Sequence, residues 1–303
     1  MVQPARKGVI PPQPRPPRER TPRSVIIRRR LIAFGVLLAA LIVLFFAIAG
    51  LPGGHKKSAP KPLVPAKPFH VVFPEGFTRR EMAARITAVD KIAKRERGAQ
   101  PLLSAPVYLR LTNNPRLIPL GFRPARRLER FLFPATYEFT VSTATRRLVI
   151  AQLQAFRRNW RQVNLAYARS KNLTPYDVLI IASMIEKETP AAEERQLVSA
   201  VIYNRLHARM PLGIDATLRY GLDIPPTESI HQSQLESNSP YNTRKVVGLP
   251  PTPIANPGLA SMQAAAHPAK VDYLYFVRKP DRKHHFFTAS FQEFQAYAKS
   301  HGF

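Results

Sequence analysis

The stretch TPYDVLIIASMIEKETP, residues 174–190, decides how the rest of the chain is interpreted. It opens with a helix start: Thr174 is an N-cap residue, Pro175 suits the first helical position, and Asp177 completes a capping box. It closes at Pro190, which cannot easily continue a helix. The pattern therefore predicts a helix of about four turns that starts after Thr174.

The middle of this helix is apolar on every side. Residues 178–185 contain a single polar side chain, Ser183, and a helix without a polar face is buried. Glu186 follows directly. If its carboxyl group is shielded from water, the pKa of that group rises and it can act as a general acid. An equally open alternative is a structural glutamate that meets the next helix. Glu188, about 200° further around the helix, is interpreted as an exposed or capping residue.

The composition is strongly basic. The 303 residues contain 46 Lys and Arg against 19 Asp and Glu, which gives a formal net charge of +27. Such a charge favours anionic partners, such as lipid headgroups, teichoic acids, wall peptide carboxylates or nucleic acid, without choosing among them. There is no cysteine, which excludes a disulfide framework and thiolate chemistry.

The N-terminal part is predicted to contain no globular fold. Residues 1–30 are rich in Pro and Arg and are predicted to be a disordered basic tail in the cytoplasm. Residues 31–50 are predicted to form one transmembrane helix, with the N-terminus inside. Residues 51–68 are a Pro/Lys-rich linker. The chain is therefore expected in the cytoplasmic (inner) membrane, single-pass, with its folded part extracytoplasmic. A cleaved signal ending at residues 47–49 and a buried core helix are the alternatives, but the length of the apolar run favours an uncleaved anchor.

The folded part begins at Phe69 and mixes strands with helices. A strand at residues 70–73 is followed by a turn and by a helix that Thr78 caps, with Glu81 completing a capping box. Residues 107–111 alternate like a short strand. We further predict helices over residues 145–168, 191–207, 259–266 and 291–299, and a hairpin of strands 272–277 and 284–287. The expected fold class is α+β.

A long loop covers residues 239–258 and contains five prolines. Long ordered loops usually carry sites. The amide, hydroxyl and aromatic groups of this loop suit sugar hydroxyl and N-acetyl groups. A rigid connector without a binding role is at least as open an alternative.

Seven motifs occur in the order of one known family. They are residues 128–134 (LERFLFP), 182–189 (ASMIEKET), 201–206 (VIYNRL), 239–243 (SPYNT), 248–251 (GLPP), 253–258 (PIANPG) and 273–277 (YLYFV). Together they resemble the YceG-like endolytic murein transglycosylases, from about Phe69 to the C-terminus.

The resemblance implies a small LysM-like α/β unit over residues 69–130 and a mixed α+β catalytic domain over residues 131–303. It implies that Glu186 is the catalytic residue. This glutamate would protonate the bond between MurNAc and GlcNAc, and then help the MurNAc 6-hydroxyl to close a 1,6-anhydro ring without consuming water. Such cutting would terminate or release nascent glycan strands.

Further family positions supply candidate substrate-binding residues. These are Asp215, Tyr241, Asn242, Asn256 and His285. No metal and no cofactor is expected. The expected partners are peptidoglycan glycan strands, the cytoplasmic membrane and peptidoglycan synthases, and no nucleic acid.

The chain departs from the family pattern at several positions around the expected cleft. Arg130 and Ala135 stand where the family usually has Gly and Asp. Gly213 and Ile214 replace the usual Gln-Ser/Thr, and Lys283 replaces the usual Gly before the histidine pair. These changes bear on how the cleft holds glycan and leave Glu186 unaffected.

Other functions stay open. The same fold could serve as a catalytically inactive, membrane-anchored peptidoglycan-binding scaffold, or as an ordinary muramidase that uses two carboxylates and water. A nucleic-acid-binding protein is prompted by the charge alone, since no recognition motif is present. A metal enzyme is weakly supported, because the adjacent His284 and His285 lack further ligands at suitable spacing.

Overall fold

The computed structural model describes residues 23–49, 68–119, 122 and 127–302. The chain divides into two compact units, residues 1–65 and 66–303. The predicted linker over residues 51–68 lies outside the described residues except at its last position.

The first unit contributes one described helix, α1 (Arg23–Ala49). The helix begins within the predicted disordered tail, so residues 23–30 are helical, while residues 1–22 lie outside the described residues. In the described part of the chain, no helix combines the length and the apolar character needed to cross a bilayer. The predicted transmembrane helix over residues 31–50 is therefore not confirmed.

The second unit is an α+β fold with two small antiparallel sheets, each of two strands, in its described residues. Its elements in chain order are β1 (Phe69–Val72), α2 (Arg79–Arg97), α3 (Ala105–Thr112), the 3-10 helix η1 (Pro115–Leu117), β2 (Thr136–Phe139), α4 (Thr145–Trp160), α5 (Ala166–Ser170), α6 (Pro175–Glu188), η2 (Ala192–Glu194), α7 (Arg195–His207), α8 (Asp215–Leu222), α9 (Gln232–Leu235), α10 (Leu259–Ala266), β3 (Tyr275–Arg278), β4 (His285–Thr288) and α11 (Phe291–Ser300). The predicted fold class is confirmed.

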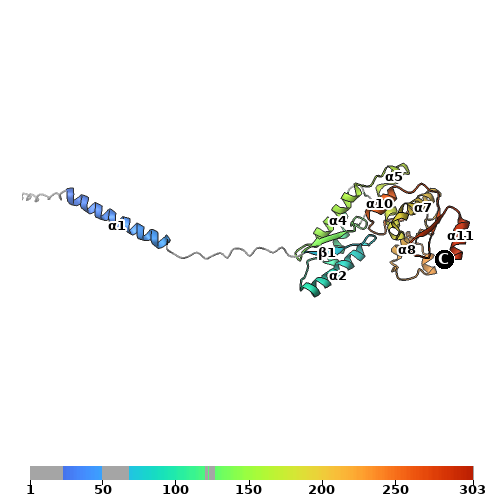
Figure 1. Ribbon diagram of the computed structural model, residues 1–303, viewed down its shortest axis with the longest axis horizontal. Helices are drawn as coiled ribbons and strands as arrows, with labels where there is room; N and C mark the ends of the chain where they lie inside the picture. Colours follow the sequence, from blue (N-terminus) through green and yellow to red (C-terminus); the bar gives the residue numbers. More distant parts are fainter. Residues whose placement is uncertain (1–22, 50–67, 120–121, 123–126, 303) are drawn as a thin grey trace, which may run out of the picture. The chain divides into compact units, whose positions relative to one another are not determined.

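The first sheet joins segments that are far apart in sequence. Strand β1 pairs with β2 in the register Phe69↔Phe139 and Val72↔Thr136. Helix α2 packs on β1, α3 packs on α2 and α4 packs on α3, and β1, α2 and α4 lie together in Figure 1. Strand β1 lies before residue 130 and β2 lies after it, so the predicted domain boundary between residues 130 and 131 passes between the two strands of this one sheet. The LysM-like character of this part stays a prediction.

Two predicted elements of this region differ from those observed. Residues 107–111 form part of helix α3, not a strand, because Ser104 caps the helix and Tyr108 and Thr112 are buried one turn apart. The predicted helix over residues 145–168 is interrupted between α4 and α5. Helix α4 ends at Trp160 in a turn in which the Val163 N–H donates to the Trp160 carbonyl (3.0 Å). The Asn164 side chain then accepts the Ala166 N–H (2.9 Å) at the start of α5.

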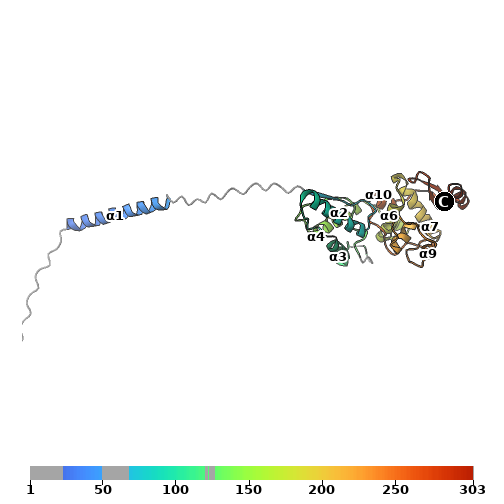
Figure 2. The ribbon, with the colours of Figure 1, turned by 90° about the horizontal axis from the view of Figure 1, so that it is seen from below.

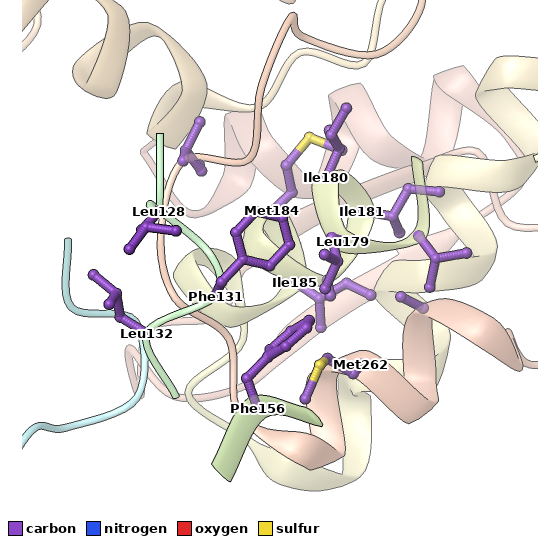
Figure 3. Close-up of a cluster of buried hydrophobic side chains, with 14 of the residues drawn as sticks. Leu128, Phe131, Leu132, Phe156, Leu179, Ile180, Ile181, Met184, Ile185 and Met262 are labelled. Carbon is purple, nitrogen blue, oxygen red and sulfur yellow. The ribbon is translucent and has the colours of Figure 1, made fainter. Parts of the chain in front are cut away.

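Helix α6 lies at the centre of the core. The Thr174 cap, its capping box with Asp177, and the first-turn proline are all as predicted. Helices α7 and α10 pack on α6, and the three lie side by side in Figure 2. Figure 3 shows apolar side chains of α6 among Leu128, Phe131, Phe156 and Met262. The one polar side chain within the apolar run, Ser183, donates to the Ile180 carbonyl (2.7 Å) and accepts the Ile254 N–H (3.0 Å).

The C-terminal hairpin is confirmed with small shifts at its ends. Strands β3 and β4 pair in the register Tyr275↔Thr288 and Arg278↔His285. Helix α11 packs against both strands. Asn204 on α7 fastens the chain just before the hairpin, since its Nδ2 donates to the carbonyl oxygens of Val271 and Tyr273, both at 2.9 Å.

Candidate active site

The last turn of α6 carries two glutamates into different surroundings. Glu186 is half-buried beside the N-terminus of α10, where the Gly258 N–H donates to its Oε2 at 2.9 Å. Gly258 is the N-cap of that helix. On the other side, Gly76 lies close to the Glu186 side chain, since a Cβ added there would meet Glu186 Cγ at 3.4 Å. In the described part of the chain, no ion pair involves Glu186.

A second carboxylate, Glu75, lies next to Glu186. Its Oε1 would be 1.8 Å from a Cβ placed on Gly258, so a side chain at that position would collide with it. Partial burial raises the pKa of Glu75, the negative charge of Glu186 raises it further, and Arg195 opposes both. Glu75 belongs to a turn more than a hundred positions before Glu186, so the motif around Glu186 gave no sign of this neighbour.

Glu188 lines a cavity of about 880 Å³, whereas Glu186 is not among the residues that line it. Burial raises the pKa of Glu188, and the negative charge of Asp215 raises it further. The backbone N–H of Ala216 and the guanidinium groups of Arg278 and Arg244 act in the opposite direction. The interpretation of Glu188 as an exposed or capping residue is therefore wrong: the side chain is half-buried and faces the cavity.

The cavity wall comes from distant parts of the second unit. Residues 78–81 and Glu129 contribute from the N-terminal part, and α8 with the following turn contributes much of the rest. The lining also includes Arg127, Lys187, Tyr241, Ile254 and Arg278. Glu129 and Arg278 were not predicted from the sequence, since neither lies within a recognisable catalytic pattern. A smaller hollow of about 630 Å³ between α7 and residues 268–273 has one acidic residue, Asp272, in its lining.

Asp215 and Tyr241, both predicted to bind substrate, line the larger cavity, which Glu188 also lines. Asp215 is the first residue of α8 and forms an ion pair with Arg244, with Nε and Oδ1 2.6 Å apart. The Tyr241 hydroxyl is 2.8 Å from Thr252 Oγ1, and its ring packs edge-on against Tyr220. The structure thus brings these two predicted residues together with Glu188.

The other three predicted binding residues are buried away from the cavity lining. Asn242 Nδ2 donates to the carbonyl oxygens of Leu235 and Ser237 (2.9 and 2.8 Å). Asn256 Nδ2 donates to the Phe77 carbonyl (2.8 Å), and its Oδ1 accepts the Leu132 N–H (3.1 Å). His285 Nδ1 lies 2.7 Å from Glu194 Oε2. These contacts hold the fold together around the site.

Arg130 lies beside the cavity wall and shows why glycine suits this position. Its φ of 82° is in the left-handed region, which disfavours residues with a Cβ. The side chain is buried, contacts the Tyr176 hydroxyl and ring, and leaves Nε without a partner. Within the described residues, no group of three or more His, Cys, Asp or Glu side chains could hold a metal ion.

A buried helix whose last turn carries a half-buried carboxyl group into a cavity lined by charged side chains is an arrangement suited to acid–base chemistry in an α+β protein. The chain belongs to the YceG-like family, whose sequence model matches residues 54–300. It is similar to a crystal structure of a putative YceG-like protein from Listeria monocytogenes, at 28% identity and a TM-score of 0.62 over 75% of each chain.

Two curated relatives carry the name endolytic murein transglycosylase. The Bacillus subtilis protein is 37% identical over 152 residues, which is 50% of this chain and 42% of that protein. The Streptococcus pneumoniae R6 protein is 34% identical over 225 residues, which is 68% of this chain and 40% of that protein. The matched part of the chain thus spans about two fifths of the length of these relatives.

Proposed function

We propose that the chain is an endolytic peptidoglycan lytic transglycosylase, a lyase that cuts the bond between MurNAc and GlcNAc within glycan strands. Membership of the YceG-like family and the name that its curated relatives carry support the substrate and the reaction. The cavity beside α6 supports an acid–base mechanism. Cutting within strands would terminate or release nascent glycan.

We assign the acid–base role to Glu188. The observation that carries this assignment is its half-buried position in the cavity, where burial and then Asp215 raise the pKa of its carboxyl group. A general acid must hold its proton until the glycosidic oxygen accepts it. The family resemblance favours Glu186 for this role, and that assignment stays a prediction. The Glu186 carboxylate accepts the Gly258 N–H, and Glu186 is not among the residues that line the cavity.

One carboxyl group suffices for both steps of this reaction. Protonated Glu188 gives its proton to the oxygen between the sugars as the bond to the MurNAc anomeric carbon breaks. The resulting carboxylate then takes the proton of the MurNAc 6-hydroxyl, whose oxygen bonds to the anomeric carbon and closes the 1,6-anhydro ring. No water is consumed, and Glu188 ends in its starting protonation state.

Hydrolysis is the second candidate, because Asp215 lies beside Glu188. Two carboxylates at a scissile glycosidic bond are the usual equipment of enzymes that add water. The products separate the two reactions: transglycosylase products end in an anhydro sugar and are lighter than muramidase products by one water. Mass spectrometry of the released fragments reads this difference directly.

Digestion of purified sacculi by the full chain and two matched variants tests the proposal. We expect anhydro-ended fragments from the wild type, a loss of about a hundredfold or more in rate for Glu188→Gln, and retained cutting by Glu186→Gln. The reverse pattern would return the role to Glu186. A wild-type chain that cuts nothing would leave the catalytically inactive peptidoglycan-binding scaffold as the better description.

The wider setting of the enzyme rests on sequence alone. The structure gives no support to a transmembrane helix in the described residues, so an inner-membrane location has to be tested by cell fractionation. Contact with peptidoglycan synthases and the LysM-like character of residues 69–130 also stay predictions. Co-purification with the synthases would test the first of them.

A further inference from the structure

Arg278 differs from most of the arginines around the cavity. Arg80 pairs with Asp223 at 2.7 Å, Arg244 pairs with Asp215 at 2.6 Å, and Arg219 donates to backbone carbonyl oxygens. Arg278 also lines the cavity, but its side chain is exposed, and no ion pair in the described part of the chain includes it. Arg127 also lines the cavity without an ion pair in the described residues, but Arg278 is the one of the two whose charge acts on Glu188, so the donors of Arg278 are available beside that carboxyl group.

The element that carries Arg278 is firmly held. Arg278 is the last residue of β3 and pairs with His285 on β4. His285 is buried, and both its ring Nδ1 and its backbone N–H contact the Glu194 carboxylate, at 2.7 and 3.0 Å. A planar guanidinium group on a fixed strand suits recognition of a carboxylate by two parallel hydrogen bonds.

The charge of Arg278 acts against the acid beside it. Its positive charge lowers the pKa of Glu188, whereas burial and Asp215 raise it. The groups that face Glu188 are Asp215, the Ala216 N–H, Arg244 and Arg278, and Arg244 is already paired with Asp215. A ligand anion bound to Arg278 would cancel this opposing charge and help Glu188 to keep its proton.

We propose that Arg278 binds a carboxylate carried on the lactyl arm of MurNAc, and so selects substrate next to the cut bond. The inference rests on the proposed function, because it takes its substrate from there. The carboxylate has two possible sources: the lactyl group itself in strands without peptides, or the stem peptide in intact strands. Both are presented on the same arm of the same sugar.

Binding measurements on the full chain test the proposal without requiring cleavage. Three tetrasaccharides serve as probes in a Glu188→Gln background: one with stem peptides, one with free lactyl carboxylates, and one of GlcNAc alone. We expect Arg278→Gln to weaken binding of at least one carboxylate-bearing probe about tenfold, and to leave the GlcNAc probe unchanged. The probe that loses affinity identifies the source of the carboxylate. Arg278→Lys should recover part of the lost affinity, since lysine keeps the positive charge but cannot form the two parallel hydrogen bonds of a guanidinium group.

Lys279→Gln is the matched control. It removes the same charge at the next position, which lies just beyond the end of β3 and outside the cavity lining, and should change none of the three affinities. Equal weakening of all three probes by Arg278→Gln, no weakening, or no binding by the parent chain would each overturn the proposal. A wild-type chain that cuts no glycan, while the carboxylate-selective loss persists, would overturn the proposed function and leave this inference standing.

Discussion

The side chains of Glu186 and Glu188 leave α6 about 200° apart, and this separation decides their chemistry. Glu186 meets the N-terminus of α10, where its Oε2 accepts the Gly258 N–H at 2.9 Å. Glu188 meets Asp215 in a half-buried position that disfavours a second negative charge. The two residues share a motif, but only Glu188 lines the cavity.

Glu188→Gln is expected to raise the free energy of unfolding at neutral pH, by about 1 kcal/mol. The folded state raises the pKa of Glu188, through burial and then Asp215, so folding favours the protonated carboxyl group. The stability this group contributes is fully present below its ordinary pKa of 4.5 and is lost as the pH rises through the raised value. Glutamine imitates the protonated form, so the advantage of the variant should vanish toward acidic pH.

Chemical unfolding of wild type and variant across this pH range measures the difference. Glu228→Gln is the control, because it removes the same formal charge from an exposed position. A gain for Glu188→Gln that is equally large at pH values below 4.5 and at neutral pH would contradict the argument. Glycan cutting should fall as the pH rises through the pKa of Glu188, because ionised Glu188 has no proton to donate.

At the scale of elements, the sequence predicted correctly those features that depend on neighbouring residues, namely helix caps and the hairpin. The caps of α2 and α6 and the β3–β4 hairpin follow from residues within a few positions of one another. Residues 107–111 were misassigned because a short alternating run fits a strand or a helix, and the deciding burial of Tyr108 and Thr112 depends on packing against α2 and α4.

The candidate site could be predicted only in part for the same reason. The motif placed two glutamates at the end of a buried helix, but it did not indicate which of them faces a cavity. That outcome depends on Asp215, Glu75 and Gly258, which come from other segments of the chain. Asn256 and His285 lie in family motifs, yet in the structure their polar atoms are engaged by the fold.

His285→Ala is expected to destabilise the second unit by about 3 kcal/mol, because it leaves Glu194 buried without its side-chain partner. Loss of the imidazole should also loosen β4 and therefore the position of Arg278 across the register. Urea-induced unfolding measures the first effect. The second should appear as weaker binding of the carboxylate-bearing probe.

His284→Ala provides the control on the same hairpin. His284 pairs with Asp281 and Glu193 at the surface, at 2.8 and 3.1 Å. Surface pairs of this kind contribute little, so the change in stability should be much smaller than that for His285→Ala. A loss for His284→Ala as large as that for His285→Ala would show that the buried pair has no special role in holding the hairpin.

At the scale of the whole second unit, the N-terminal part contributes directly to the candidate site. Strand β1 pairs with β2, and residues 78–81 and Glu129 form one wall of the cavity. Residues 66–303 make one compact unit. Function is therefore expected to depend on the whole unit, and removal of residues 69–130 would remove part of the cavity as well as a strand partner.

Replacement of Asn256 tests whether the N-terminal part and the rest of the second unit fold together. Its backbone exchanges hydrogen bonds with Gly76 and Phe77, and its side chain joins Phe77 to Leu132. Asn256→Ala leaves the Leu132 N–H without this partner and should cost about 2 kcal/mol, or about 4–8 °C in Tm. Activity should fall too, because the turn before Thr78 positions the cavity wall.

Calorimetry of the full chain and of Asn256→Ala distinguishes a single cooperative unit from two weakly joined ones. If the contacts of Asn256 bind the N-terminal part to the rest, the variant should still unfold the second unit in one transition, at a lower temperature. Asn238→Ala, at an exposed position just before the long loop of residues 239–258, should change stability by no more than about 0.5 kcal/mol. Two separate transitions for the second unit of the wild type would instead mean that the N-terminal part folds on its own, and the cavity would then be assembled by docking of two independently stable parts.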